Sequence, residues 1–195
     1  MAQARRNKRG EAQRQELLEA AAQRFAHEPY DQVSLDAIAA DAGMSRPSLY
    51  YYFGSKRDCY LAVIESWGSQ MLITADAAKG LGRDDVVARL LDTYLDFAEN
   101  SEEAYRTVMG GGLGNDPQVQ AFINQWRTRF SELIMHLAGR DAPVTPAIRI
   151  QLSGFLGFIE GATLDWLDHR DVPRSDLSAL LRDAGKQIML EHSQA

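Results

Sequence analysis

The hydrophobic positions of this chain recur every three or four residues almost throughout, and no stretch alternates strictly between polar and apolar residues. Such spacing places apolar side chains on one face of an α-helix, so it predicts an all-α protein without strands or hairpins. Proline, glycine and helix-capping residues divide the pattern into nine helices. Their expected ranges are about 11–27, 34–42, 45–53, 55–78, 84–100, 102–109, 117–138, 146–169 and 175–191.

Two short helices separated by a tight turn follow the first long helix. Ser34 and Ser45 stand at their N-cap positions, and Gly43 can adopt the left-handed conformation that ends the first of them. Leu49 and Phe53 are four residues apart and are expected to point into the core. Two helices joined in this way form a helix-turn-helix, whose second helix enters the major groove of DNA.

The outward face of the second short helix suits DNA binding. Arg46 can reach guanine edges, and Pro47 offers apolar surface to a thymine methyl group. The hydroxyls of Ser48 and of the neighbouring tyrosines can donate to phosphates. Lys56 begins the next helix, where its charge opposes the helix dipole unless a phosphate lies against that N-terminus. The alternative interpretation is that this tyrosine-rich helix only packs on a neighbour.

These residues resemble the DNA-binding signature of the TetR family of bacterial one-component regulators. The matching positions are Leu17, Leu18, Ala21, Ala22, Phe25, Tyr30, Val33, Ser34, Ile38, Ala39, Gly43, Met44, Ser45, Leu49, Tyr50, Phe53 and Lys56. The resemblance implies phosphate contacts at Ser34, Tyr50, Tyr51 and Lys56, and base reading at Arg46, Pro47 and Ser48. With the N-cap residue Ser45, these positions make up the expected DNA-binding set.

The same resemblance implies a two-part organisation. Residues 1–55 are expected to form a three-helix DNA-binding domain with a basic arm at 1–10, and residues 56–195 a helical domain for effector binding and dimerisation. The implied partners are a palindromic operator in double-stranded DNA, a second copy of the chain and a small-molecule effector.

Charge is distributed in a way that agrees with DNA binding, although the net charge is −6. Charges act over only about 8–10 Å in salt solution. Residues 1–60 hold nine Lys or Arg against eight Asp or Glu, so the acidic excess lies in the rest of the chain. The first nine residues, MAQARRNKR, carry four positive charges and no negative one. They are either a disordered arm that reaches DNA or a solvated tail.

Several classes of protein are disfavoured. No apolar run approaches the roughly 18 residues of a membrane span, and no signal-peptide core follows the start, so a cytoplasmic protein without a membrane partner is expected. The four histidines lack metal-ligand spacing, and no nucleophile motif occurs. We therefore expect neither an enzyme nor a bound metal or cofactor. The single cysteine, Cys59, excludes an internal disulfide and is interpreted as a structural thiol rather than a redox sensor.

A glycine-rich segment at residues 110–115 resembles a phosphate-binding loop only in composition. No strand precedes it and no Lys-Ser/Thr pair follows it, as such a loop requires. The favoured interpretation is a flexible joint between two helices.

The second half of the chain is rich in aromatic residues, a subset of which is expected to line a cavity for a hydrophobic or amphipathic effector. The candidate residues are Trp67, Met71, Tyr94, Phe97, Tyr105, Met109, Phe122, Trp126, Phe155 and Ile159. Glu160 interrupts the apolar run of its helix and is costly to bury without a partner. It either contacts the effector or forms an ion pair with Arg127 or Arg129, and the ion pair is favoured.

The last two helices are candidates for a dimer interface. The helix at 146–169 is apolar almost all round and carries three glycines along one strip, and the last helix carries a leucine stripe. Such helices can pair with their symmetry mates in an isologous contact, or they can be core of a monomer. The expected interface residues are Gly154, Gly157, Gly161, Leu177, Leu180, Leu181, Ala184 and Ile188.

Taken together, these patterns favour a sequence-specific DNA-binding regulator, in the form of a homodimeric repressor that an effector releases from DNA. Two alternatives remain. One is a helical small-molecule-binding protein or enzyme whose N-terminal helices do not bind DNA specifically. The other is a DNA binder without sequence preference, whose affinity disappears as salt is added.

Overall fold

The computed structural model describes residues 2–77, 81–109, 117–137 and 144–190. Within these ranges the chain forms nine α-helices and one short 3₁₀ helix and no strand, which confirms the all-α prediction. The elements are α1 (Ala2–His27), η1 (Tyr30–Gln32), α2 (Leu35–Asp41), α3 (Arg46–Phe53), α4 (Lys56–Ala77), α5 (Arg83–Asn100), α6 (Glu102–Met109), α7 (Pro117–Leu137), α8 (Pro146–His169) and α9 (Arg174–Leu190). The glycine-rich segment at 110–115 lies outside the described residues.

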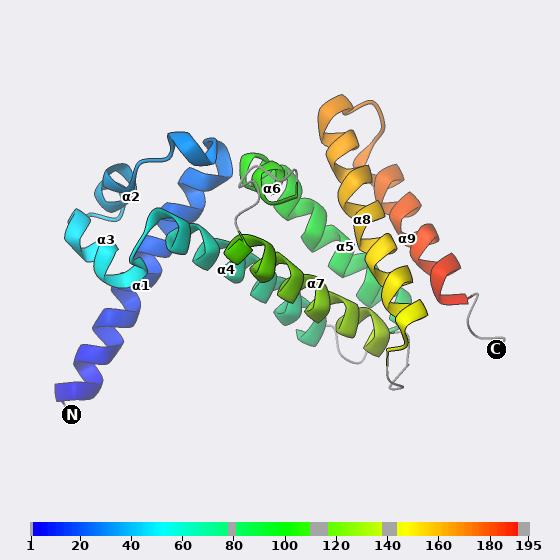
Figure 1. The fold of residues 1–195 in the computed structure, drawn as a ribbon, viewed down its shortest axis with the longest axis horizontal. Coiled ribbons are helices and arrows are strands. Elements are labelled where there is room, and N and C mark those ends of the chain that lie inside the picture. The colour runs from blue at the N-terminus through cyan, green and yellow to red at the C-terminus, as the bar shows by residue number, and fades with distance from the viewer. Residues whose placement is uncertain (1, 78–80, 110–116, 138–143, 191–195) are drawn as a thin grey trace.

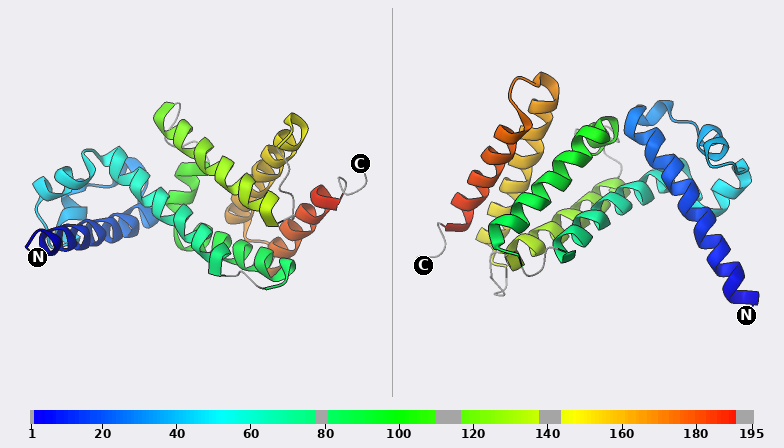
Figure 2. Two further views of the ribbon diagram at one scale, coloured as in Figure 1. Left: turned by 90° about the horizontal axis from the view of Figure 1, so that it is seen from below. Right: turned by 180° about the vertical axis from the view of Figure 1, so that it is seen from behind.

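The molecule is elongated, with α1, α2 and α3 at one end and the antiparallel pair α8 and α9 at the other (Figure 1). Helix α4 leaves the N-terminal end and runs into the larger helical body, where it packs against both α5 and α7. The two further views show the same separation of the ends (Figure 2). We call α1–α3 the head and α5–α9 the body, with α4 joining them.

Helix α1 is longer than the pattern predicted. It begins at Ala2, so the basic N-terminal residues continue the helix and are not the disordered arm expected as one alternative. Ala, Gln, Arg and Lys favour helix, and no proline interrupts them. Gly10 lies within this helix, and a Cβ there would sit 3.7 Å from the Tyr52 hydroxyl, in ordinary contact. The helix therefore passes close beneath the end of α3.

The two short helices of the head are set by local signals. Gly43 has φ of +64°, the left-handed conformation expected at the end of α2. Ser34 and Ser45 occupy the N-cap positions, but neither side chain makes a capping hydrogen bond. Ser55 caps α4 through its Oγ, which accepts from the Asp58 amide at 3.1 Å and donates to the Asp58 carboxylate at 2.6 Å. Ser55 and Asp58 thus form a capping pair at the start of α4.

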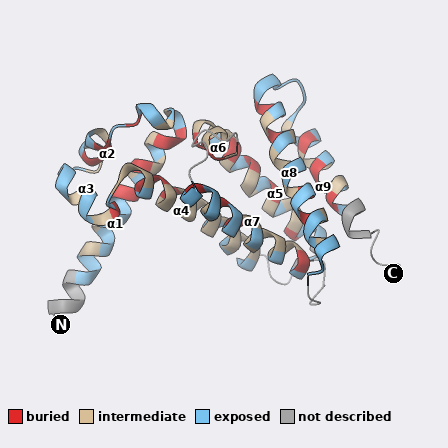
Figure 3. Ribbon diagram, in the orientation of Figure 1, coloured by how far each residue is buried: buried red, intermediate tan, exposed pale blue. Residues whose placement is uncertain are grey.

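One continuous hydrophobic core holds the head and extends into the body. Leu49 and Phe53 are buried in it, as predicted, with Leu17, Phe25 and Ile38. The same core includes body residues, namely Val108 of α6 and Val119 and Ile123 of α7. Buried positions accordingly run without a break through the junction of α1, α4 and α6 (Figure 3). The head is therefore packed against the body and not tethered by α4 alone.

A second hydrophobic core occupies the far part of the body, between α5, α6, α8 and α9. Its buried members are Leu91, Leu95, Ala98, Tyr105, Trp166, Leu167, Leu177 and Leu181. An ion-pair network covers one edge of this core, with Arg174 bonded to Asp96 and Glu99, and Arg170 bonded to Glu99 and Glu102. These contacts fix the loop between α8 and α9 against α5.

Candidate nucleic-acid interface and ligand cavity

Helix α3 presents a polar and aromatic face to solvent. Tyr51 is 82% exposed and Tyr50 is 41% exposed. Leu49, the residue before them in the helix, is fully buried in the core. Arg46 and Pro47 are exposed in the first turn. A helix of eight residues that buries only Leu49 and Phe53 leaves the rest of its surface available for a partner. None of the eight expected DNA-binding residues is buried.

Arg46 is held by two neighbours in this structure. Its guanidinium donates to the Asp36 carboxylate of α2 at 3.0 Å and to the Tyr50 hydroxyl at 3.2 Å, and it lies 5.5 Å from the centre of the Tyr50 ring. The hydrogen bond to Tyr50 and the charge of Asp36 raise the pKa of Arg46, so the group keeps its positive charge. The side chains of Arg46 and Asp36 are both more than half exposed, so solvent screens the pair and a base edge can compete for the guanidinium.

Lys56 lies where α4 meets η1. Its ammonium group donates to the carbonyl of Asp31 at 3.2 Å and lies 4.7 Å from the centre of the Tyr30 ring. A backbone carbonyl satisfies only one of the three N–H donors of a lysine. The remaining donors and the N-terminus of α4 suit an anion, in the manner expected for a DNA phosphate. The three serines of the expected set are also at the surface, with Ser45 and Ser48 joined by a hydroxyl contact of 3.0 Å.

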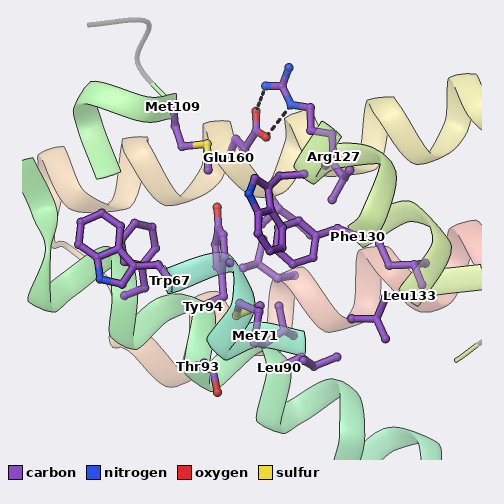
Figure 4. A pocket seen from close by; sticks show the side chains of 18 of the residues that line it. Trp67, Met71, Leu90, Thr93, Tyr94, Met109, Arg127, Phe130, Leu133 and Glu160 are labelled. Atoms are coloured by element: carbon purple, nitrogen blue, oxygen red, sulfur yellow. Dashed lines mark hydrogen bonds and ion pairs between the residues drawn. The ribbon is translucent and has the colours of Figure 1, made fainter. Parts of the chain in front are cut away.

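The body encloses a cavity of about 800 Å³ between α4, α5, α7, α8 and α9, with α6 at the end nearest the head (Figure 4). Eight of the ten expected residues line it: Trp67, Met71, Tyr94, Phe97, Met109, Trp126, Phe155 and Ile159. Most of the remaining wall is also aliphatic or aromatic, including Leu90, Phe130 and Leu133. The cavity therefore favours a largely apolar ligand.

Two of the ten expected residues do not line the cavity. Tyr105 is fully buried in the second core, where its ring packs against Phe97 and its hydroxyl donates to the Glu160 carbonyl at 3.4 Å. Phe122 lies on α7 next to the cavity-lining Ile123, but on a different face of the helix. Aromatic composition alone does not say which face of a helix borders the cavity.

An ion pair forms part of the cavity wall. Arg127 of α7 donates from Nε and from a terminal nitrogen to the two carboxylate oxygens of Glu160 in α8, at 3.1 and 2.6 Å (Figure 4). The Glu160 side chain is only 15% exposed. This fork-to-fork geometry gives the buried carboxylate its partner. The sequence left two interpretations of Glu160 open, a contact with the effector or an ion pair, and the structure shows the ion pair with Arg127.

Tyr94 adds a neutral polar group to the mainly apolar wall. Its hydroxyl is hydrogen-bonded to that of Tyr105, and the two rings meet edge to face with centroids 5.8 Å apart. Burial raises the pKa of Tyr94 well above its usual value and raises that of Tyr105 to about 12. Both phenols are therefore neutral at physiological pH and act only as hydrogen-bonding groups.

Sequence reasoning missed the contribution of α9 to the cavity. Arg182, Gly185 and Lys186 line it from α9, as does Leu181. The pattern had suggested that α9 uses its apolar stripe for dimer contacts. No signal in the sequence distinguishes the helix face that borders a cavity from the face that meets a second subunit.

The expected dimer residues divide into two groups. Leu177 and Leu181 are buried within the chain, at 5% and 0% exposure, because this stripe of α9 packs on α5 and α8. They therefore leave almost no exposed surface for a second subunit, and their place in a dimer interface stays a prediction. The three glycines of α8 are exposed, and a Cβ on any of them would meet nothing within 4 Å. Leu180 is 51% exposed. Ala184 is half-buried, and the side chain of Ile188 lies outside the described residues.

Comparison with family models places both parts of the chain. Residues 17–63 match the model described as "Bacterial regulatory proteins, tetR family", and residues 84–186 match "Tetracyclin repressor-like, C-terminal domain". The chain belongs to the TetR family. The first match covers the C-terminal part of α1, all of α2 and α3, and the start of α4, and the second covers most of the body. The resemblance inferred from the sequence is thereby confirmed.

Individual relatives agree with this assignment. The chain is 28% identical over 143 residues to the transcriptional activator FasR of Mycolicibacterium smegmatis, an alignment that spans 70% of this chain and 65% of FasR. It is 25% identical over 199 residues to the regulator SrpR of Pseudomonas putida, spanning 94% of this chain and 92% of SrpR. Both relatives are named as transcriptional regulators of the helix-turn-helix type.

Solved structures share the fold. A TetR-family regulator from Streptomyces coelicolor has a TM-score of 0.77 at 24% identity, with 91% of this chain and 80% of that chain covered. The regulator FadR from Bacillus subtilis, solved in complex with stearoyl-CoA, has a TM-score of 0.68 at 16% identity, with 90% of this chain and 97% of that chain covered. At these identities the likeness establishes the fold alone.

The described residues contain no group of three or more His, Cys, Asp or Glu arranged to hold a metal ion. None of their helices is long and apolar enough to cross a membrane.

Proposed function

We propose that this TetR-family protein is a homodimeric transcriptional repressor that binds a palindromic operator through α3 and leaves it when an effector fills the cavity. Residues 1–55 bind DNA in this proposal, and residues 56–195 bind the effector and the second subunit. The protein acts in the cytoplasm and not as an enzyme. The observation that carries the proposal is a single hydrophobic core. It joins the head to α4 and also contains Val108 and Ile123, two residues of the cavity wall.

The effector is expected to be a small hydrophobic or amphipathic molecule. The cavity volume of about 800 Å³ lies within the roughly 300–1,000 Å³ of typical ligand sites, and its wall is mainly apolar. The solved complex of the FadR relative with stearoyl-CoA supports a ligand with a long aliphatic chain. Effector binding then favours a different separation of the two heads, with a coupling free energy of about 1–3 kcal/mol.

The exposed face of α8 supports dimerisation. Three glycines leave a smooth strip, Phe158 is 43% exposed beside it, and Leu180 of α9 is 51% exposed. A symmetric contact through this face would present two copies of α3 to successive major grooves, whose half-sites recur about 34 Å apart.

The DNA-binding proposal is tested by titrating the purified protein against genomic fragments at near-physiological salt and sequencing what it retains. A palindrome with half-sites about one helical turn apart, or slightly more, supports a dimeric sequence-specific regulator. Transcription in vitro from the retained fragment then shows whether the protein represses or activates, and a fall in the amount of transcript supports a repressor. Uniform retention, or none, rejects sequence-specific regulation and leaves a ligand-binding helical protein.

The dimer is tested separately with Phe158→Glu, which places a charge on the proposed contact face. Sedimentation velocity should give a dimer for the wild type and a monomer for the variant. Ile73→Glu, at an apolar residue of α4 that is 58% exposed, is the matched control and should remain dimeric. A wild-type monomer, or a dimer that survives Phe158→Glu, contradicts the proposed interface.

A further inference from the structure

The end of the cavity at α9 carries two basic side chains, Arg182 and Lys186. Arg182 lines the cavity, and within the described part of the chain no carboxylate lies within ion-pair distance of it. Lys186, one turn further along α9, also lines the cavity, and its partner Asp84 is 3.7 Å away, beyond hydrogen-bonding distance. The cavity therefore carries positive charge at this end.

A close helix contact lies beside these two side chains. Gly185 lies between them on α9 and is buried, and a Cβ at this residue would sit 2.9 Å from Cζ of Phe155 in α8. Only glycine allows α9 to approach α8 so closely without a shift of the ring. Arg182 and Lys186 line the cavity beside this contact, although the Lys186 side chain remains 48% exposed.

Other charged groups of the wall are already occupied. Glu160 is bonded at both oxygens by Arg127, so a cationic ligand would have to displace an arginine to reach it. Asp96 is paired with Arg174, outside the cavity. Asp84 is the one wall carboxylate near Arg182 and Lys186, and its side chain is 76% exposed, so solvent screens its repulsion of an anion.

The length of the cavity indicates which kind of ligand group could extend away from this charged end. Wall residues of α5 run from Asp84 to Ser101, a distance of about 25 Å at the helical rise. The far end, near the head, is formed by Trp67, Phe97 and Met109. Arg182 and Lys186 lie at one end of the space, and the rest of its length is mainly apolar apart from the paired groups Arg127, Glu160 and Asp96.

We propose that the cavity binds a single-chain amphiphile with an anionic head group, whose head is held by Arg182 and Lys186 and whose aliphatic chain extends toward Trp67 and Met109. This inference rests on the proposed effector site and adds the charge and orientation of the ligand. Arginine binds carboxylates and phosphates through paired N–H groups, and the head can be either.

The experiment uses probes that share one tail and differ in the head: laurate, lauroyl-CoA, dodecanol and dodecylamine. Each is titrated below its aggregation concentration into the full-length protein, with the fluorescence of the wall residues Trp67 and Trp126 as readout. Laurate or lauroyl-CoA should bind about tenfold or more tightly than dodecylamine, the effect of one charge-assisted hydrogen bond. Arg182→Gln should abolish that preference and leave dodecanol affinity unchanged.

Matched variants separate this result from a loss of folding. Arg89→Gln changes an exposed arginine of α5 that does not line the cavity and should behave as the wild type. Arg182→Lys keeps the charge and should keep most of the preference. A defect of Arg182→Gln with laurate alone assigns the head to a carboxylate, and a defect with lauroyl-CoA alone assigns it to the CoA phosphates. Equal affinity for all heads, or equal behaviour of Arg182→Gln and Arg89→Gln, overturns the inference.

The same probes, added to the complex of the protein with its selected operator, distinguish the two proposals. Selective binding of anionic probes without release of DNA supports the head-group site and contradicts the repressor mechanism. Release of DNA at the same concentration of every probe, regardless of its head, supports the mechanism and overturns the head-group site.

Discussion

Gly68 of α4 lies so close to Trp126 of α7 that a Cβ at residue 68 would come within 2.6 Å of the indole Cζ2. Trp126 also donates from Nε1 to the Glu65 carboxylate of α4 at 3.1 Å, and Arg129 bonds the other Glu65 oxygen at 3.2 Å while lying over the indole. The indole thus lines the cavity on one side and contacts the helix that leads to the head on the other.

Gly68→Ala should separate α4 from α7, because the added methyl group overlaps the indole. Overpacking of this kind costs about 1–3 kcal/mol, against a gain of about 1 kcal/mol from replacing a helical glycine. We expect a lower melting temperature and weaker operator binding in the absence of effector. Ser66→Ala, at an exposed position of the same helix, is the control. If Gly68→Ala keeps the stability and operator affinity of the wild type, the contact between residue 68 and Trp126 does not require a glycine.

Trp126→Phe should weaken the response to effector more than it weakens DNA binding. The variant keeps an aromatic ring at the cavity wall and removes the hydrogen bond to Glu65, so α4 loses one connection to the ligand site. The quantity to measure is the ratio of operator Kd with and without effector, which should fall toward one. The paired variant Glu65→Gln, which keeps an acceptor for the indole, should retain more of the response. If both variants respond as the wild type, coupling does not run through this bond.

Asp36→Asn should strengthen DNA binding. It releases Arg46 from the ion pair at 3.0 Å and removes a negative charge beside the expected DNA-contacting face. The gain should be modest and should apply to all sequences, because the repulsion of phosphates does not depend on the base. Gel-shift titrations of operator and unrelated DNA at several salt concentrations measure it. A loss of affinity would indicate that Asp36 positions Arg46 for reading and does not compete with DNA.

Lys56→Ala and Arg46→Ala should have different signatures on DNA. Removal of a phosphate contact weakens binding to all sequences and reduces the salt slope by about one, whereas removal of a base contact relaxes preference at one position at a cost of about 1–3 kcal/mol. The first result is expected for Lys56 and the second for Arg46. Competition against operator variants with single base changes tests both, and an unchanged ranking of operators in Arg46→Ala contradicts base reading.

Tyr60→Phe should weaken the junction between head and body. The hydroxyl donates to the Ala104 carbonyl of α6 at 3.2 Å, and the ring meets those of Phe25 and Tyr30 at 4.9 and 5.1 Å. Loss of the hydrogen bond costs about 1 kcal/mol. Burial also raises the pKa of Tyr60, so the wild type should lose stability above the usual pKa of 10.0, where the unfolded phenol ionises. Urea denaturation from pH 8 to 11 should show this loss in the wild type and a smaller one in Tyr60→Phe.

The positions of the helices were determined by local signals in the sequence. Boundaries of α5, α6, α7 and α8 fall within a residue or so of the ranges predicted from apolar spacing and capping residues. Gly43 ends α2, and Leu49 and Phe53 turn inward, because backbone conformation and the helical period depend on neighbouring residues alone. The signature around α3 likewise needed no tertiary information, since its residues are close in sequence.

What the sequence left open was decided by contacts between distant helices. Leu177 and Leu180 have the same chemistry, but the first packs on α5 and α8 and the second faces solvent. Arg127 and Arg129 were equal candidates for Glu160, and the packing of α7 on α8 selected Arg127. Arg182 lines the cavity beside the close contact of Gly185 with Phe155, which joins α9 to α8. A helical period specifies which residues share a face, but only the assembled helices determine what that face meets.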